Sequence, residues 1–279
     1  MGVGRREGSG MSVVEIERPR GDVVVLRLNR PEKLNAIDRE LLDGLWSAIA
    51  GIREDPECRV VILTGAGRGF CAGADLTQPD EAIAPGDERR GRLGRVWGMQ
   101  EYLTGVAVAL NSLRQPVIAA VNGPAVGGGL GFALACDLRV ASTEARFGAL
   151  FMKIGLSNCD VAVSYFLPRI VGAGRALELL LTARVIDAPE AERLGLVNRL
   201  VPPERLLPSA IELAGEIAAN SEFGVWMTKE GVWANIDAPS LQHAVQLEYR
   251  TQMVGVYGDN MAEAFAAFRE KRPPSWEPV

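Results

Sequence analysis

Before residue 203, the chain alternates short apolar runs with longer segments whose apolar residues recur every three or four positions. The apolar runs cover residues 23–30, 60–65, 116–123 and 137–142 and are typical of strands buried on both faces. Helical stripes follow two of these runs and consist of Leu41, Leu42, Leu45, Trp46, Ile49 and Ile52, and of Val96, Met99, Leu103, Val106, Leu110 and Leu113. Asp38 is the predicted N-cap of the first helix. Strands that alternate with helices predict an α/β core.

Beyond residue 203 the strand-like runs stop and the pattern becomes helical. Residues 206–219, 240–254 and 260–272 all have helical periodicity. Their apolar faces need a partner, either in the same chain or in a neighbouring subunit. We therefore predict a disordered leader at 1–11, with Met1 or Met11 as the native start, an α/β core at 12–202 and a helical region at 203–279.

Charge and composition narrow the function. The chain has 279 residues and a formal net charge of -5, whereas nucleic-acid-binding domains usually carry a basic stripe. The mixed cluster at 88–95 is either a solvated loop or helix start, or an anion site. No apolar run is long enough to span a bilayer, and the N-terminus lacks a signal-type segment. These features predict a cytoplasmic protein without nucleic-acid or membrane partners.

Few residues are available for nucleophilic or metal chemistry. The four cysteines lack CxxC spacing, so they indicate neither a zinc site nor a disulfide framework. His243 is the single histidine, which excludes a multi-histidine metal site and leaves it as the one candidate base for a serine or cysteine nucleophile. It lies in a predicted helix, where it is interpreted as a helix-face residue. We expect no metal.

Two glycine-rich loops follow strands. The loop after residue 65 and the loop at 127–129 both lack the glycine spacing of a dinucleotide site, and no P-loop motif occurs. The bare backbone at 71–75 and at 127–129, the latter at a helix start, instead suits an oxygen that develops negative charge. Two converging N–H groups there would make an oxyanion hole. The alternative is tight packing of a helix on a strand.

Several long motifs in the right order resemble the crotonase, or enoyl-CoA hydratase/isomerase, superfamily. They are LNRPEKLNAI, VVILTGAGRGFCAGADL, QPVIAAVNGPAVGGG, the block from FLPRIVGAGRALELLL to LGLVNRLVP, and AAFREKRP. The resemblance covers nearly the whole chain after the leader. It implies a spiral of ββα units, a C-terminal helical trimerisation region, assembly into trimers or dimers of trimers, and acyl-CoA thioester substrates. Coenzyme A would be part of the substrate, with no separate cofactor.

The same resemblance implies site residues. The oxyanion donors correspond to the backbone N–H groups of Ala74 and Gly128, so that a thioester carbonyl would lie against residues 127–129, where a Cβ would be in its way. The substrate- and CoA-binding positions are Lys33, Ala36, Ala72, Asp75, Leu76, Gly127, Phe151, Phe268 and Lys271. For Lys33 and Lys271 the alternative is an ordinary solvated lysine. Residues 77–97 are expected to line or cover the acyl pocket.

The chain departs from the family's hydratases at both catalytic glutamates, whose positions correspond to Gly131 and Phe151. Asp160 falls where dienoyl-CoA isomerases and the 4-chlorobenzoyl-CoA dehalogenase carry a working aspartate, although a helix N-cap is the alternative. The dehalogenase also needs a histidine and a tryptophan that are not at matching positions. The sequence thus predicts a double-bond isomerase with Asp160 as its single acid/base. The alternatives are a hydratase, a lyase with atypical acids, and a non-catalytic acyl-CoA binder.

Overall fold

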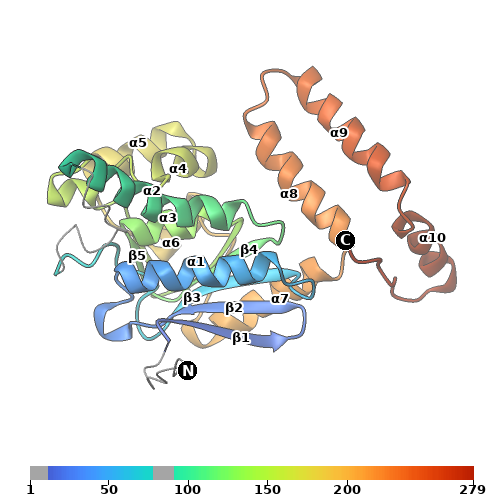
Figure 1. The fold of residues 1–279 in the computed structure, drawn as a ribbon, viewed down its shortest axis with the longest axis horizontal. Coiled ribbons are helices and arrows are strands. Elements are labelled where there is room, and N and C mark those ends of the chain that lie inside the picture. The colour runs from blue at the N-terminus through green and yellow to red at the C-terminus, as the bar shows by residue number, and fades with distance from the viewer. Residues whose placement is uncertain (1–11, 78–90) are drawn as a thin grey trace, which may run out of the picture.

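The computed structural model describes residues 12–77 and 91–279, and it is built around a six-stranded sheet (Figure 1). The predicted leader and most of the predicted pocket cover lie outside the described residues. The strand order is β1-β2-β3-β4-β6-β9, antiparallel between β1 and β2 and parallel elsewhere. These strands are Val14–Arg20, Val23–Leu28, Val60–Gly65, Val117–Val121, Leu138–Ser142 and Arg199–Val201.

A three-stranded sheet lies beside the main one and contains shorter strands. Its order is β5-β7-β8, formed by Pro124–Val126, Arg146–Gly148 and Ile186–Asp187. The helices that follow in the core are α1 Arg39–Arg53, α2 Arg92–Asn111, α3 Gly128–Ala135, α4 Val163–Val171, α5 Ala173–Thr182 and α6 Ala188–Arg193. Short 3-10 helices occupy Pro31–Lys33, Phe151–Ile154 and Pro203–Arg205.

The main sheet is covered on both faces, as its continuously apolar strands predict. Val24, Leu26 and Leu28 of β2 belong to the larger apolar core, together with the buried stripe of α1. Val23 and Val25 face the other way and pack in a second core with α7, Leu206–Ala218. Because successive strand residues point to opposite faces, one strand supplies both cores. The helix α7 is therefore packed on the sheet, although it lies in the helical region beyond residue 203.

The last three helices extend away from this body (Figure 1). They are α8 Glu222–Ile236, α9 Leu241–Val256 and α10 Asn260–Glu270, and we call them the arm. Lys229 of α8 anchors the arm, because its ammonium lies 2.8 Å from the Asp137 carboxylate and donates to the Gln115 carbonyl. Trp233 donates its indole N–H to the same aspartate. Beyond α8, the apolar side chains of the arm are largely exposed.

The long predicted elements are confirmed. Asp38 caps α1, since its Oδ1 accepts the N–H of Leu41 at 2.8 Å. The strands predicted at 60–65, 116–123 and 137–142 appear as β3, β4 and β6, and the three predicted C-terminal helices appear as α7, α9 and α10. The pattern did not reveal β1, whose outer residues are exposed, the strands of two or three residues, or α8, none of whose residues is buried.

Candidate active site

Two loops meet at the edge between the sheets, and both carry glycines. The loop after β3 pairs with the segment before α1, because Ile37 donates to the Gly73 carbonyl at 2.7 Å and accepts from the Asp75 N–H at 2.9 Å. The same loop pairs with β5, where the Val126 N–H donates to the Cys71 carbonyl at 3.0 Å. These contacts place the 71–75 loop directly against the start of α3.

The backbone N–H groups of Ala74 and Gly128 are brought to this junction. A Cβ added at Gly73 would lie 3.4 Å from the amide nitrogen of Gly128 and 3.0 Å from the carbonyl of Val126, so the two loops touch. Gly73 and Gly127 adopt φ of +82° and +54°, which L-residues with a side chain rarely adopt. Among the residues that the structure describes, neither N–H donates a hydrogen bond. The geometry thus leaves two neighbouring donors for an incoming oxygen.

The glycines of α3 are required by packing as well as by ligand approach. A Cβ at Gly129 would lie 2.1 Å from the carbonyl oxygen of Cys71, which is an impossible contact. One at Gly127 would meet only Gly73 Cα at 3.7 Å and Phe151 Cε1 at 3.9 Å, so the space in front of Gly127 is comparatively open. We expected an approaching ligand to exclude side chains from all of residues 127–129. At Gly129 the structure gives a different reason, because the backbone of Cys71 leaves no room for a Cβ.

Gly131 lies one turn into α3, and it is one of the two positions where the resemblance leads us to expect a hydratase glutamate. A Cβ there would lie 2.5 Å from the carbonyl oxygen and 2.6 Å from the Cγ1 of Val161. Val161 and the following Ala162 have φ of +44° and +57°, which costs a non-glycine residue backbone strain. Val161 is also buried, so its side chain and backbone together occupy the space that any side chain at 131 would need.

Asp160 directly precedes this strained pair and is half-buried. Its Oδ1 accepts the N–H of Val161 at 2.7 Å, and its Oδ2 accepts Nε2–H of Gln100 at 3.4 Å. The N-cap of α4 is Ala162, with no side-chain cap. Asp160 therefore does not cap α4, and the N-cap alternative is wrong. Its carboxylate instead faces α2 across the site.

Phe151 follows β7 and is the other position where the resemblance leads us to expect a glutamate. It is buried, and its ring edge lies against Gly127. An aromatic ring at this position presents no proton carrier to a ligand beside Gly127. The structure thus brings together Ala74, Gly127, Gly128 and Phe151, while Asp160 adjoins Gly131 through Val161.

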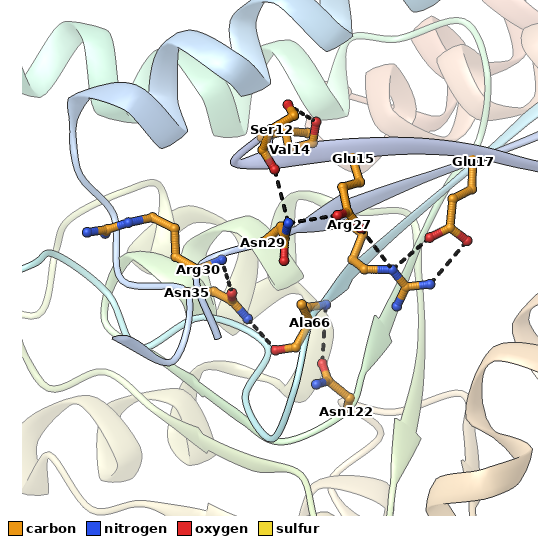
Figure 2. A network of polar contacts seen from close by, with 11 residues as sticks. Ser12, Val14, Glu15, Glu17, Arg27, Asn29, Arg30, Asn35, Ala66 and Asn122 are labelled. Atoms are coloured by element: carbon orange, nitrogen blue, oxygen red, sulfur yellow. Dashed lines mark hydrogen bonds and ion pairs between the residues drawn. The ribbon is translucent and has the colours of Figure 1, made fainter. Parts of the chain in front are cut away.

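A buried polar frame holds the loops in register. Asn35 accepts the Arg30 N–H at 2.8 Å and donates to the carbonyls of Ala66 at 3.0 Å and Gly69 at 2.8 Å, as Figure 2 shows for Arg30 and Ala66. The same figure shows the neighbouring Asn29 and Arg27 tied to β1. Asn35 has φ of +56°, a left-handed conformation that asparagine tolerates better than most residues.

The predicted CoA contact Asp75 belongs to this frame. The Arg30 guanidinium lies 3.0 Å from the Asp38 carboxylate and 3.1 Å from that of Asp75, whose side chain is almost fully buried. Hydrogen bonds from Thr77, together with Arg30 and Lys33, hold the pKa of Asp75 at about 2 against the opposing effect of burial. The carboxylate is thus already engaged, and it fixes the 71–75 loop to the segment that begins α1.

The other predicted binding residues fall into two groups. Lys33 and Leu76 are exposed at the mouth of the same loops, with Lys33 Nζ 3.4 Å from the Thr77 hydroxyl. Ala36 and Ala72 lie behind them in the backbone frame. Phe268 and Lys271 lie on and after α10, which Figure 1 places far from α3 within one chain. The structure therefore does not bring these last two residues to the site of their own chain.

Other chemistries find little support in the described part of the chain. Burial raises the pKa of the Cys58 thiol to about 11 and those of Cys71 and Cys136 to about 12, so none of them is a ready thiolate. His243 lies on α9 of the arm, away from both glycine loops. Residues 12–77 and 91–279 contain no cluster of acidic, cysteine and histidine side chains that could hold a metal ion.

No helix in the described ranges is both long enough and apolar enough to cross a membrane.

Sequence reasoning missed three supporting side chains. Arg30, Asn35 and Gln100 each hold a predicted site residue or its loop. Arg30 and Asn35 lie within the quoted motif LNRPEKLNAI, so their place in the motif was available as a signal. Gln100 sits on the polar side of a helical stripe, and nothing in the pattern of α2 distinguishes it from a solvent-facing residue.

Comparisons with known proteins agree with this geometry. A family model described as Enoyl-CoA hydratase/isomerase matches residues 18–278. A probable enoyl-CoA hydratase of Mycobacterium bovis is 43% identical over 267 residues, covering 95% of this chain and 93% of that protein. A solved structure of a probable enoyl-CoA hydratase/isomerase from Mycobacterium abscessus has a TM-score of 0.89 at 40% identity, and the match covers 96% of this chain and 99% of that chain.

A second solved structure is that of a monofunctional enoyl-CoA isomerase from M. smegmatis. It is 41% identical, with a TM-score of 0.71, and the match covers 84% of this chain and 99% of that chain. These likenesses confirm the crotonase-type α/β fold with C-terminal helices that the motifs predicted. The chain belongs to the enoyl-CoA hydratase/isomerase family.

Proposed function

We propose that the protein is an enoyl-CoA isomerase that moves a carbon–carbon double bond along an acyl thioester, with Asp160 as its single acid/base. The observation that carries this proposal is the state of position 131. The space for a side chain there is filled by Val161, and position 151 holds a phenylalanine. By the resemblance, these are the two positions at which the family's hydratases carry the glutamates that activate water, so the proposal assigns the proton transfer to Asp160 on the adjoining segment.

The proposed reaction needs only proton transfer. Asp160 removes a proton from C2 of a 3-enoyl thioester, and the electron pair moves into the carbonyl to give a dienolate. The N–H groups of Ala74 and Gly128 stabilise the negative oxygen more than they stabilise the ground-state carbonyl. Asp160 then returns the proton at C4, which leaves a 2-enoyl thioester. Because no electron leaves the substrate, the proposed reaction requires no redox cofactor. Coenzyme A takes part only as the thiol portion of the thioester substrate.

A hydratase is the second candidate, because the similar protein of Mycobacterium bovis carries that name. Adding water across a double bond requires a group that activates the water and a group that protonates carbon. Phe151 and Gly131 supply neither, so a hydratase would have to recruit acids from elsewhere. A non-catalytic acyl-CoA binder is the remaining alternative.

The arm supports a further part of the proposal. The predicted CoA contacts Phe268 and Lys271 are exposed on the arm and far from α3 of their own chain (Figure 1). We propose a homotrimer or dimer of trimers, in which α10 of a neighbouring subunit supplies these two residues to the nucleotide.

The test is incubation with a 3-enoyl-CoA in heavy water, following double-bond position, deuterium content and product mass. We expect conversion to the 2-enoyl thioester, reduced about 10²- to 10⁴-fold in Asp160→Asn, since general acid–base groups typically contribute that much. Glu101→Gln on the exposed face of α2 is the matched control. A parallel incubation with the 2-enoyl-CoA tests the hydratase, which would give a product heavier by one water. Binding of both thioesters without turnover of either would establish the silent binder.

A further inference from the structure

Gln100 is the side chain that faces the proposed acid/base from the neighbouring helix. Its Nε2–H donates to Asp160 Oδ2 across the site, joining α2 to the segment that leads into α4. Its Oε1 is buried and has no hydrogen-bond partner among the described residues. Leaving a buried amide oxygen unpaired is costly, so this atom calls for a partner that is present in another state of the site.

We infer that Gln100 is a positioning residue that keeps Asp160 hydrogen-bonded in both protonation states of the catalytic cycle. When Asp160 is ionised, the amide N–H of Gln100 donates to Oδ2. When Asp160 carries the substrate's proton, rotation of the amide brings Oε1 round to accept the new O–H. A neutral amide can play both parts because it has a donor and an acceptor on one planar group.

The two carboxylate oxygens of Asp160 therefore have different roles in the proposed reaction. Oδ1 is held at 2.7 Å by the backbone N–H of Val161, which fixes the carboxylate relative to α3. Among the described residues, Oδ2 has only the long 3.4 Å contact from Gln100, so it is the oxygen assigned to accept and return a proton. A strong ion pair at Oδ2 would hold the carboxylate ionised, and a like charge would hold it protonated. The inference rests on the proposed function. It assigns to Gln100 the role of allowing Asp160 both to take up and to return the proton.

The test replaces the Gln100 amide by groups that cannot both donate a hydrogen bond to ionised Asp160 and accept one from protonated Asp160. Gln100→Glu has the same shape but places a second carboxylate beside Asp160, and Gln100→Met keeps volume without polarity. Loss of the N–H donor and addition of a like charge both disfavour the ionised aspartate. The ionised form of Asp160 should therefore be disfavoured in both variants, more strongly in Gln100→Glu than in Gln100→Met. The matched control is Val108→Glu, which adds the same charge to an exposed position of the same helix.

Two readouts separate this inference from the proposed function. Carbon NMR of labelled aspartate, assigned with Asp160→Asn, follows the titration of Asp160 directly, and the pH dependence of kcat follows it through activity. The other ionisable residues on these elements all stay unchanged, and they are Arg92, Arg95, Glu101 and Tyr102 on α2, Lys153 and Cys159 before Asp160, and Tyr165 and Arg169 on α4.

We expect the acidic limb of the kcat profile to move to higher pH together with the titration, so that activity lost in acidic solution is recovered as the pH is raised. Gln100→Asn, which keeps an amide, should restore part of the wild-type profile. An Asp160 titration that is the same in wild type and Gln100→Glu would overturn the inference whatever the activity. A titration that moves in a protein without isomerase activity would leave the pairing standing and refute the function.

Discussion

At the scale of single residues, the two positions expected to carry hydratase glutamates differ in their surroundings. Phe151 is a buried aromatic residue whose ring lies against Gly127. Gly131 is part of a coupled change, because the space beside it is occupied by Val161. Val161 adopts a left-handed backbone that glycine would adopt without strain. A glutamate could therefore be introduced at position 131 only together with a change at position 161.

This coupling predicts a double-mutant cycle. Gly131→Ala should lower the free energy of unfolding by about 1–3 kcal/mol, because the new methyl group overlaps Val161. In a Val161→Gly background the same change should cost at least about 0.5 kcal/mol less, since the obstructing side chain is gone and the backbone can relax. Urea denaturation of the four proteins measures the coupling.

The control for this cycle is Gly174→Ala in α5, where a Cβ would meet nothing within 4 Å. Removing a glycine from an open helical position should stabilise the protein by up to about 1 kcal/mol. Strictly additive effects of Gly131→Ala and Val161→Gly would show that the two positions are independent, and would remove the structural argument against a hydratase.

At the scale of elements, the sequence predicted those whose pattern is set by their own burial. The strands β3 and β4 are continuous apolar runs because both faces are covered, and α1 shows its cap at Asp38. Strands of two or three residues such as β8 are too short for any period, and α8 has no fully buried side chain to mark it. The motifs located the glycine loops, but the contact of Gln100 with Asp160 is tertiary and leaves no local trace.

The loop frame around Asp75 predicts an acid dependence of stability. The folded-state pKa of about 2 lies below the unfolded value of roughly 3.9, so this group stabilises the fold fully above about pH 4. That contribution is lost as the pH falls through the folded pKa. Asp75→Asn should therefore be less stable than wild type near neutral pH, and the difference should shrink as the pH falls from about 5 to about 2.

Urea midpoints measured across this pH range check the expectation. Glu263→Gln is the comparison variant, because the pKa of Glu263 is also held at about 2, by hydrogen bonds from Arg272 and Ser275 in the exposed arm. Its removal should leave the 71–75 loop and the isomerase activity intact, whereas Asp75→Asn should disturb both. If the curves of Asp75→Asn and wild type stay parallel down to the acid limit, Asp75 does not carry this linkage.

At the scale of the whole molecule, the body and the arm differ in how far their apolar side chains are buried. The body buries its apolar stripes in two cores, while the arm leaves apolar side chains exposed along its helices, including Val232, Ile236, Met253, Val256 and Tyr257. A groove of about 790 Å³ runs between α8, α9 and α10, lined by several of these residues. A contiguous apolar surface of this extent is characteristic of an interface.

The exposed apolar surface of the arm leads us to predict that the chain assembles into a trimer or a dimer of trimers, and that this assembly affects activity. Light scattering should give a mass three or six times that of one chain, and Ile236→Asp with Val256→Asp should lower it, because two carboxylates would be buried unpaired in the interface. Leu181→Asp, at an exposed apolar position on α5 of the body, should not change the mass. If α10 of a neighbour supplies Phe268 and Lys271 to the nucleotide, disassembly should raise the KM for acyl-CoA more than it lowers kcat, because Asp160 and the two N–H donors belong to one chain. A monomeric wild-type protein with full affinity for acyl-CoA would contradict both parts, and would assign the nucleotide contacts to Lys33 and its loop alone.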